Sequence, residues 1–154
     1  MDKNIENIVS DFQILGTNIK TLNLTNDFIY FQDNNEDIDR KVGINYEILD
    51  IHQSHDKLIG TLLFMIDLDI TDKSREDHNQ IHLSLEIEGG FYSSNLDQNV
   101  FKQMIGINGV ASLFSIARSF ILSVTSQAIP GSQIVIPMIN VTKIKKSKNL
   151  KEER

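Results

Sequence analysis

The 154-residue sequence predicts an α+β fold in which a four-stranded antiparallel sheet is followed by one long helix. In residues 62–70 and 81–92 large apolar side chains recur with period two, which indicates strands with one buried face. Residues 107–129 contain a single charged side chain, Arg118, and repeat apolar residues at helical spacing. Because the strands come first and the helix follows, the order is typical of α+β rather than α/β proteins.

The first two strands are predicted from weaker patterns. Residues 12–24 are compatible with a strand but do not alternate cleanly, and a polar loop rich in Asp and Asn follows at residues 33–39. Residues 44–51 place Ile44, Tyr46 and Ile48 on one face of an extended chain, which predicts the second strand.

The third and fourth strands have the clearest alternation in the chain. Their predicted buried residues are Leu62, Phe64, Ile66, Leu68 and Ile70 in the third strand, and Ile81, Leu83, Leu85, Ile87 and Phe91 in the fourth. Gly89 and Gly90 predict a bulge or bend near the end of the fourth strand. The short connection at residues 72–79 suits an antiparallel hairpin, and no helix between the strands is long enough for a parallel crossover.

The long helix is apolar on two faces. One stripe consists of Ile107, Val110, Ala111, Phe114, Ala117, Ile121 and Ala128, and a second set consists of Leu113, Ile116 and Phe120. One sheet can cover only one side of a helix. We therefore expect a second copy of the protein to cover Leu113, Ile116 and Phe120.

A membrane span is the alternative for this helix, because the low-charge stretch is long enough to cross hydrocarbon. Its many Ser, Thr, Asn and Gln residues and the central Arg118 are unfavourable in lipid. The sequence therefore predicts no stable membrane insertion. After the helix, Pro130 is expected to end it, and residues 131–141 form an apolar extended segment that is too hydrophobic for an ordinary surface loop.

Composition and charge predict one cytoplasmic domain, residues 1–142, followed by a basic tail, residues 143–154. The chain has no cysteine, which suits a reducing compartment, and its first residues lack a secretory signal pattern. Residues 1–142 carry nine Lys or Arg against nineteen Asp or Glu, a net −10, whereas residues 143–154 carry six against two, a net +4. An acidic body disfavours nucleic acid as a partner. The tail is expected to be solvated and disordered, with contact to nucleic acid or an acidic partner as the alternative.

Metal sites and cofactors are not indicated by any motif. The spacings of the four histidines match no standard metal site. These residues are His52, His55, His78 and His82. The acidic run beginning at Asp33 resembles a calcium loop, but such a loop needs Gly at its sixth position and an acidic residue at its twelfth, where this chain has Ile38 and Ile44.

Enzymatic motifs are also lacking, since no Gly-rich phosphate loop, GxSxG elbow or HExxH helix occurs. The glycines of residues 106–109 open the predicted helix and could hold an anion, or they serve only as a hinge. A hotdog-fold thioesterase is the nearest enzymatic alternative, but its candidate residues, Asp97 and Asn108, have no evident catalytic partner. We expect no enzyme activity, no cofactor and no metal.

The helix and the segment after it resemble the bacterial SecB export-chaperone family. The resemblance rests on LFSIAR at residues 113–118, on Ile121, Ser123, Ser126 and Pro130, and on QIVIPMINV at residues 133–141. That family has an LFxxAR-type sequence in its long helix, before a proline-bearing crossover that ends in Asn and an apolar residue. FQI at residues 12–14 and GGFY at residues 89–92 are similar to its first strand and fourth-strand end. The match spans most of residues 12–141.

The resemblance implies a four-stranded sheet, a long helix at an oligomer interface, and a homotetramer built as a dimer of dimers. It implies a holdase that binds unfolded preproteins in the cytosol and passes them to the SecA motor, without nucleotide or metal. Clients would bind apolar grooves beside the crossover and the first loop, and physical reasoning also favours exposed apolar, Met and aromatic side chains there. The client-binding candidates are Phe28, Tyr30, Phe31, Ile134, Ile136, Met138, Ile139 and Val141.

The chain departs from the family at both of its implied motor contacts. Residues 21–25 of the first strand are neutral where the family is acidic, so the candidates for SecA binding are Asp67, Asp69, Glu86 and Glu88. The tail KIKKSKNLKEER stands where the family has an apolar second helix flanking the groove, followed by a tail that assists motor contact. Two alternatives therefore stay open: a chaperone dedicated to one client, such as an antitoxin, and a structural domain whose crossover is buried against a partner.

Overall fold

The computed structural model of the chain describes residues 10–29, 37–74, 80–129, 131 and 133–144. The predictions for Tyr30, Phe31, most of the acidic loop, His78, Pro130 and the tail from residue 145 lie outside these residues.

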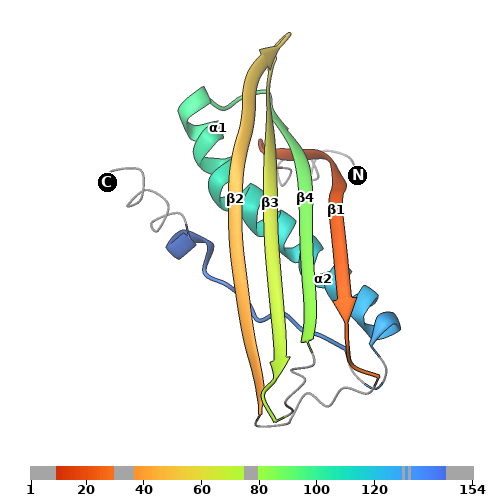
Figure 1. Cartoon of the computed structure of the whole chain (residues 1–154). Helices are drawn as coiled ribbons and strands as arrows, with labels where there is room; N and C mark the ends of the chain where they lie inside the picture. Colours follow the sequence, from red (N-terminus) through yellow and green to blue (C-terminus); the bar gives the residue numbers. More distant parts are fainter. Residues whose placement is uncertain (1–9, 30–36, 75–79, 130, 132, 145–154) are drawn as a thin grey trace, which may run out of the picture.

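Four long antiparallel strands form one sheet, as predicted. They are β1 (Gln13–Asn26), β2 (Ile38–Ser54), β3 (Lys57–Asp72) and β4 (Gln80–Ser93), in the spatial order β1-β4-β3-β2 (Figure 1). β2 is longer than the alternation at residues 44–51 predicted, because its pairing with β3 continues to Ile38 opposite Asp72. Asp39, assigned to the acidic loop from the sequence, therefore belongs to β2.

The alternation predicted for β3 and β4 is confirmed side chain by side chain. All ten predicted inner residues are buried, and the residues between them lie on the opposite, outer face. The irregularity expected at Gly89 and Gly90 falls instead on the partner strand. β1 has a pairing shift between Ile14 and Gly16, opposite Phe91 and Gly90, so that Leu15 is the extra residue.

One continuous helical rod crosses the inner face of the sheet (Figure 1). It consists of α1 (Gln98–Met104), the π-helical turn η2 (Ile105–Gly109) and α2 (Val110–Ala128). The rod begins earlier than predicted, because the Asp97 side chain caps it by accepting hydrogen bonds from the backbone N–H groups of Asn99 and Val100 at 2.8 and 3.2 Å. The predicted start at residues 106–109 is therefore wrong, and the anion site proposed for it has no helix end to use.

Glycines allow the rod to lie close to the sheet. A Cβ atom at Gly89 of β4 would lie 2.7 Å from Leu113 Cδ2, and one at Gly60 of β3 would overlap Ile105 of η2. By length and apolar composition the rod Gln98–Ala128 could cross a membrane, but the core helix of a soluble protein meets the same criteria. Here one side of α2, including Val110 and Phe114, packs into the core.

The segment after α2 returns across the same side of the sheet (Figure 1). Gly131 adopts a φ of 83°, a left-handed conformation that glycine accepts without strain, and residues 133–140 then form no helix or strand. Ile134 and Ile136 join the hydrophobic core formed by the sheet and the rod. We call residues 133–140 the crossover.

Candidate functional site

The crossover is attached to α2 by two polar side chains of the helix. Arg118 Nε donates a hydrogen bond to the Ile136 carbonyl at 2.7 Å, and the Ile134 N–H donates to Thr125 Oγ1 at 2.9 Å. The Thr125 hydroxyl itself donates to the Ile121 carbonyl at 2.7 Å. Arg118 and Thr125 are seven residues apart, about two helical turns, so both lie on the same face of α2. These bonds hold the crossover along the helix.

Attachment in this position divides the crossover into buried and exposed side chains. Ile134 and Ile136 are buried in the core, whereas Val135 between them is 54% exposed and Met138 is 74% exposed. Burial alternates from Gln133 to Ile136, as it does along an extended chain, whereas Pro137 and Met138 are both exposed. Ile134 and Ile136, predicted to contact clients, offer no surface in this structure. Ile139 and Val141 are half-buried.

The start of the loop after β1 lies at the C-terminal end of α2. Asn26 Nδ2 donates to the Ala128 carbonyl at 3.5 Å, and the Phe28 N–H donates to Asn26 Oδ1 at 2.9 Å. Phe28, a predicted client residue, is buried, while its neighbour Ile29 is 90% exposed. Ile29 and Val135 were not among the client-binding candidates predicted from the sequence, although each is adjacent to one of them.

The outward side of α2 carries an open hollow of about 510 Å³. It is lined by Ser115, Ile116, Ser119, Phe120 and Ser123, which repeat at helical spacing. Ile116 and Phe120 thus lie where a partner was predicted. Leu113 does not, because it is buried against Gly89 of its own sheet. Its position three residues after Val110 and four before Ala117, both buried, places it on the inner side.

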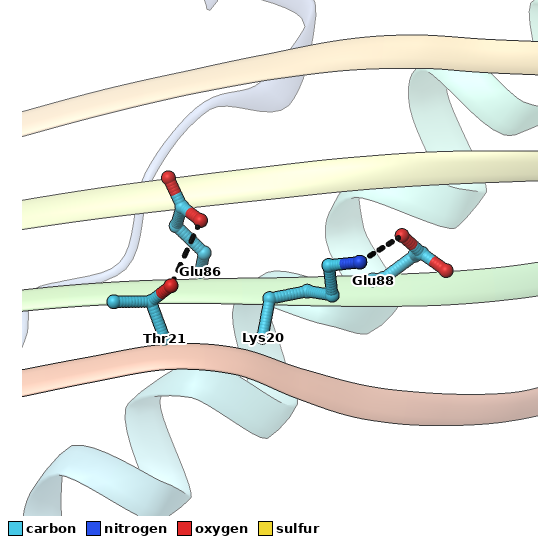
Figure 2. A network of polar contacts seen from close by, with 4 residues as sticks. All are labelled: Lys20, Thr21, Glu86 and Glu88. Atoms are coloured by element: carbon cyan, nitrogen blue, oxygen red, sulfur yellow. Dashed lines mark hydrogen bonds and ion pairs between the residues drawn. The ribbon is translucent and has the colours of Figure 1, made fainter.

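The four acidic candidates for motor binding share the outer face of the sheet. The strand register places Asp67 opposite Ser84 and Asp69 opposite His82, and Glu86 and Glu88 follow on the same face of β4. Two of these carboxylates contact β1: Thr21 Oγ1 donates to Glu86 Oε2 at 3.2 Å, and Lys20 Nζ lies 3.5 Å from Glu88 Oε2 (Figure 2). On the neighbouring strand pair, His82 Nδ1 lies 2.6 Å from Asp69 Oδ1. The β2 residues Glu47 and Asp50 pair with outer-face positions of β3 and add to the acidic character of this face.

Within the described part of the chain, His, Asp and Glu side chains do not gather in groups of three that could hold a metal ion. His52 Nδ1 lies 2.6 Å from Asp50 Oδ2, in a pair separate from His82 and Asp69. Asp97, the carboxylate considered for an enzyme, caps α1.

Comparisons with known proteins found similarity in the fold. No protein-family model and no curated protein matches the sequence. Among solved structures, the chain is similar to the Mycobacterium tuberculosis Rv1957 SecB-like chaperone in complex with a ChAD peptide from the Rv1956 HigA1 antitoxin, with a TM-score of 0.56 and 9% identity, over 84% of this chain and 91% of that one. A Streptococcus agalactiae protein of unknown function has a TM-score of 0.44 and 10% identity, over 82% and 97% of the two chains. The first of these comparisons shows that this chain has a SecB-like fold.

Proposed function

We propose that this protein is a SecB-like molecular chaperone, a holdase that binds non-native polypeptides on apolar surface along the crossover. The observation that carries the proposal is the exposure of Val135 and Met138 on a segment that Arg118 and Thr125 attach to the helix. The Mycobacterium tuberculosis neighbour is a SecB-like chaperone holding an antitoxin peptide, which supports a client-binding role for the same fold here.

The physical properties of this surface suit a binder with little sequence selectivity. A Met side chain has three rotatable bonds and a polarisable sulfur, so Met138 can adapt to different apolar side chains. Ile29, which is 90% exposed and lies three residues after the Asn26 that bonds the end of α2, would add further apolar surface. A holdase acts by mass action on the unfolded state, so the proposal requires no enzyme activity, no nucleotide and no metal. We place this activity in the cytoplasm.

The proposed assembly is a homotetramer, a dimer of dimers, because the subunit has two distinct surfaces suited to a second copy. The first is the outward side of α2 with Ile116 and Phe120. The second is the free edge of β1, where Lys20 is the single charged residue and Leu15 is 57% exposed. The other edge strand, β2, contains five Asp, Glu, Lys or Arg residues. Charged residues protect exposed sheet edges from pairing with other chains. We therefore expect the β1 edge, and not the β2 edge, to be covered by a second subunit.

The proposal has two forms, which differ in the client that is bound and in the protein that receives it. In the first form, unfolded preproteins are handed to SecA, which would contact Asp67, Asp69, Glu86 and Glu88 on the acidic outer face. In the second form, the protein guards one dedicated client, such as an antitoxin, and the bound peptide of the structural neighbour favours this form. Both forms use the same crossover surface.

Suppression of aggregation tests the proposal. A guanidinium-unfolded reporter enzyme is diluted with stoichiometric chaperone, and light scattering is followed. The wild-type protein should suppress scattering, and Val135→Asp combined with Met138→Asp should abolish most of this activity. Val100→Asp is the matched control, because Val100 is also exposed but lies on α1, outside the crossover. Sedimentation must show the same assembly for all variants. A double variant that suppresses scattering as well as the wild type contradicts the proposed site, and an inactive wild type favours the structural-domain alternative.

A further inference from the structure

Met138 combines high exposure with a polar contact to its sulfur atom. Arg118 Nη1 donates to Met138 Sδ at 2.9 Å, while the residue remains 74% exposed. The two other methionines that the structure describes, Met65 and Met104, are each partly buried. The chain contains no cysteine, so no thiol competes with methionine for oxidants. Among the described residues, Met138 is therefore the most accessible sulfur.

We propose that Met138 is an oxidation site through which peroxide lowers client binding, an inference that rests on the chaperone function proposed above. In the reaction a lone pair of Sδ attacks one oxygen of hydrogen peroxide, the O–O bond breaks, and the second oxygen leaves as water after proton transfer. The sulfur loses two electrons and becomes a sulfoxide, and the peroxide is reduced. Sulfoxide reductases reverse this modification, so the site can switch repeatedly.

The Arg118 guanidinium can donate a hydrogen bond to the sulfoxide oxygen, so oxidation of Met138 changes more than the polarity of one side chain. A thioether is a weak hydrogen-bond acceptor, whereas a sulfoxide oxygen is a strong one. Arg118 already donates through Nε to the Ile136 carbonyl, and its rigid fork has a further N–H directed at Met138. Oxidation therefore strengthens the attachment of the crossover to α2. It also replaces the most exposed apolar side chain of the crossover with a polar one.

Both consequences should weaken the binding of apolar client segments. The test uses purified full-length protein, hydrogen peroxide and a labelled, carboxymethylated lactalbumin that stays unfolded. Peptide mapping should locate the first added oxygen on Met138, and fluorescence anisotropy should show a dissociation constant raised by about threefold to tenfold, the scale of one apolar side chain leaving a contact. Within the Met138→Leu variant, peroxide should leave the dissociation constant unchanged. Within Met65→Leu, the peroxide effect should persist.

Hydrogen exchange of residues 133–140 provides a readout that needs no client. Oxidised wild-type protein should exchange these amides more slowly than the reduced protein, and Arg118→Lys should abolish the slowing because an ammonium lacks the fork. If no form of the protein binds lactalbumin, the chaperone function fails, while peptide mapping and exchange still test the oxidation site. Oxidation of Met138 no faster than Met65, or unchanged exchange after oxidation, overturns the inference. So does unchanged affinity after oxidation in a wild type that binds the probe.

Discussion

Removing the hydroxyl of Thr125 tests whether this side chain holds the crossover in place. Thr125 is fully buried, and its Oγ1 accepts the Ile134 N–H at 2.9 Å within the core. Thr125→Val preserves the shape of the side chain but leaves that buried N–H without its partner. An unsatisfied buried donor costs about 1–3 kcal/mol. For a chain of this size, each kcal/mol lowers the melting temperature by about 2–4 °C, so a fall of roughly 2–12 °C is expected.

Calorimetry and hydrogen exchange measure the two consequences of Thr125→Val. The melting temperature should fall as stated, and the Ile134 amide should exchange faster than in the wild type. Ser126→Ala is the matched control, because it removes a neighbouring hydroxyl that donates to the Ser123 carbonyl at 2.8 Å on the exposed side of α2. Its effect should stay within about 0.5 kcal/mol. Equal stability of Thr125→Val and wild type, with unchanged exchange at Ile134, would refute the assignment of Thr125 as an anchor.

Three further predictions concern the packing, the edge strand and the outer face. Gly89→Val should lower the free energy of unfolding, measured by denaturant titration, by about 1–3 kcal/mol, because the added side chain would overlap Leu113 of the helix. An unchanged unfolding midpoint would contradict the close approach of the helix to β4. Leu15→Lys should shift sedimentation to a smaller species. The control is Leu49→Lys, which lies at the bulge of the other edge strand, β2, is 46% exposed, and should leave the assembly intact. Identical sedimentation profiles for the two variants would show that β1 is not part of the interface. Asp67→Lys should slow association with SecA roughly tenfold at low salt while Asp56→Lys in the β2–β3 turn has less effect, as measured by stopped flow. Equal association rates for the two variants would show that SecA does not bind the outer face of the sheet.

The sheet was predictable because one physical constraint determines it. A strand with one buried face must alternate, and burial alternates in β3 from Ile59 onward and throughout β4. The ends of β2 were not predictable, since the pairing of Ile38 and Arg40 with β3 gives no alternation that stands out from the neighbouring polar residues. The bulge was placed on the wrong strand for a related reason. The missing side chain of Gly90 leaves room for an extra residue in the sheet, but only the strand pairing shows that this residue is Leu15 of β1.

The candidate site was predicted at the level of the segment and not of the residue. The sequence identified residues 131–141 as unusually apolar, but hydrophobicity does not distinguish Ile136, which is buried, from Met138, which is exposed. A usable signal was present in Arg118, the single charge of residues 107–129. A buried helix rarely keeps a cation without an acceptor, and this one holds the Ile136 carbonyl.

The amino-acid sequence by itself determined the order of strands and helix, the buried faces of β3 and β4, and an apolar crossover, because local periodicity requires these features. Only the tertiary structure decided which side of α2 faces the sheet. It placed Leu113 inside and left Ile116 at the surface, although both are aliphatic and lie three residues apart. The reason is that periodicity records how side chains are spaced around an element, whereas burial depends on which distant segments, such as Gly89 or the crossover, come to lie against it.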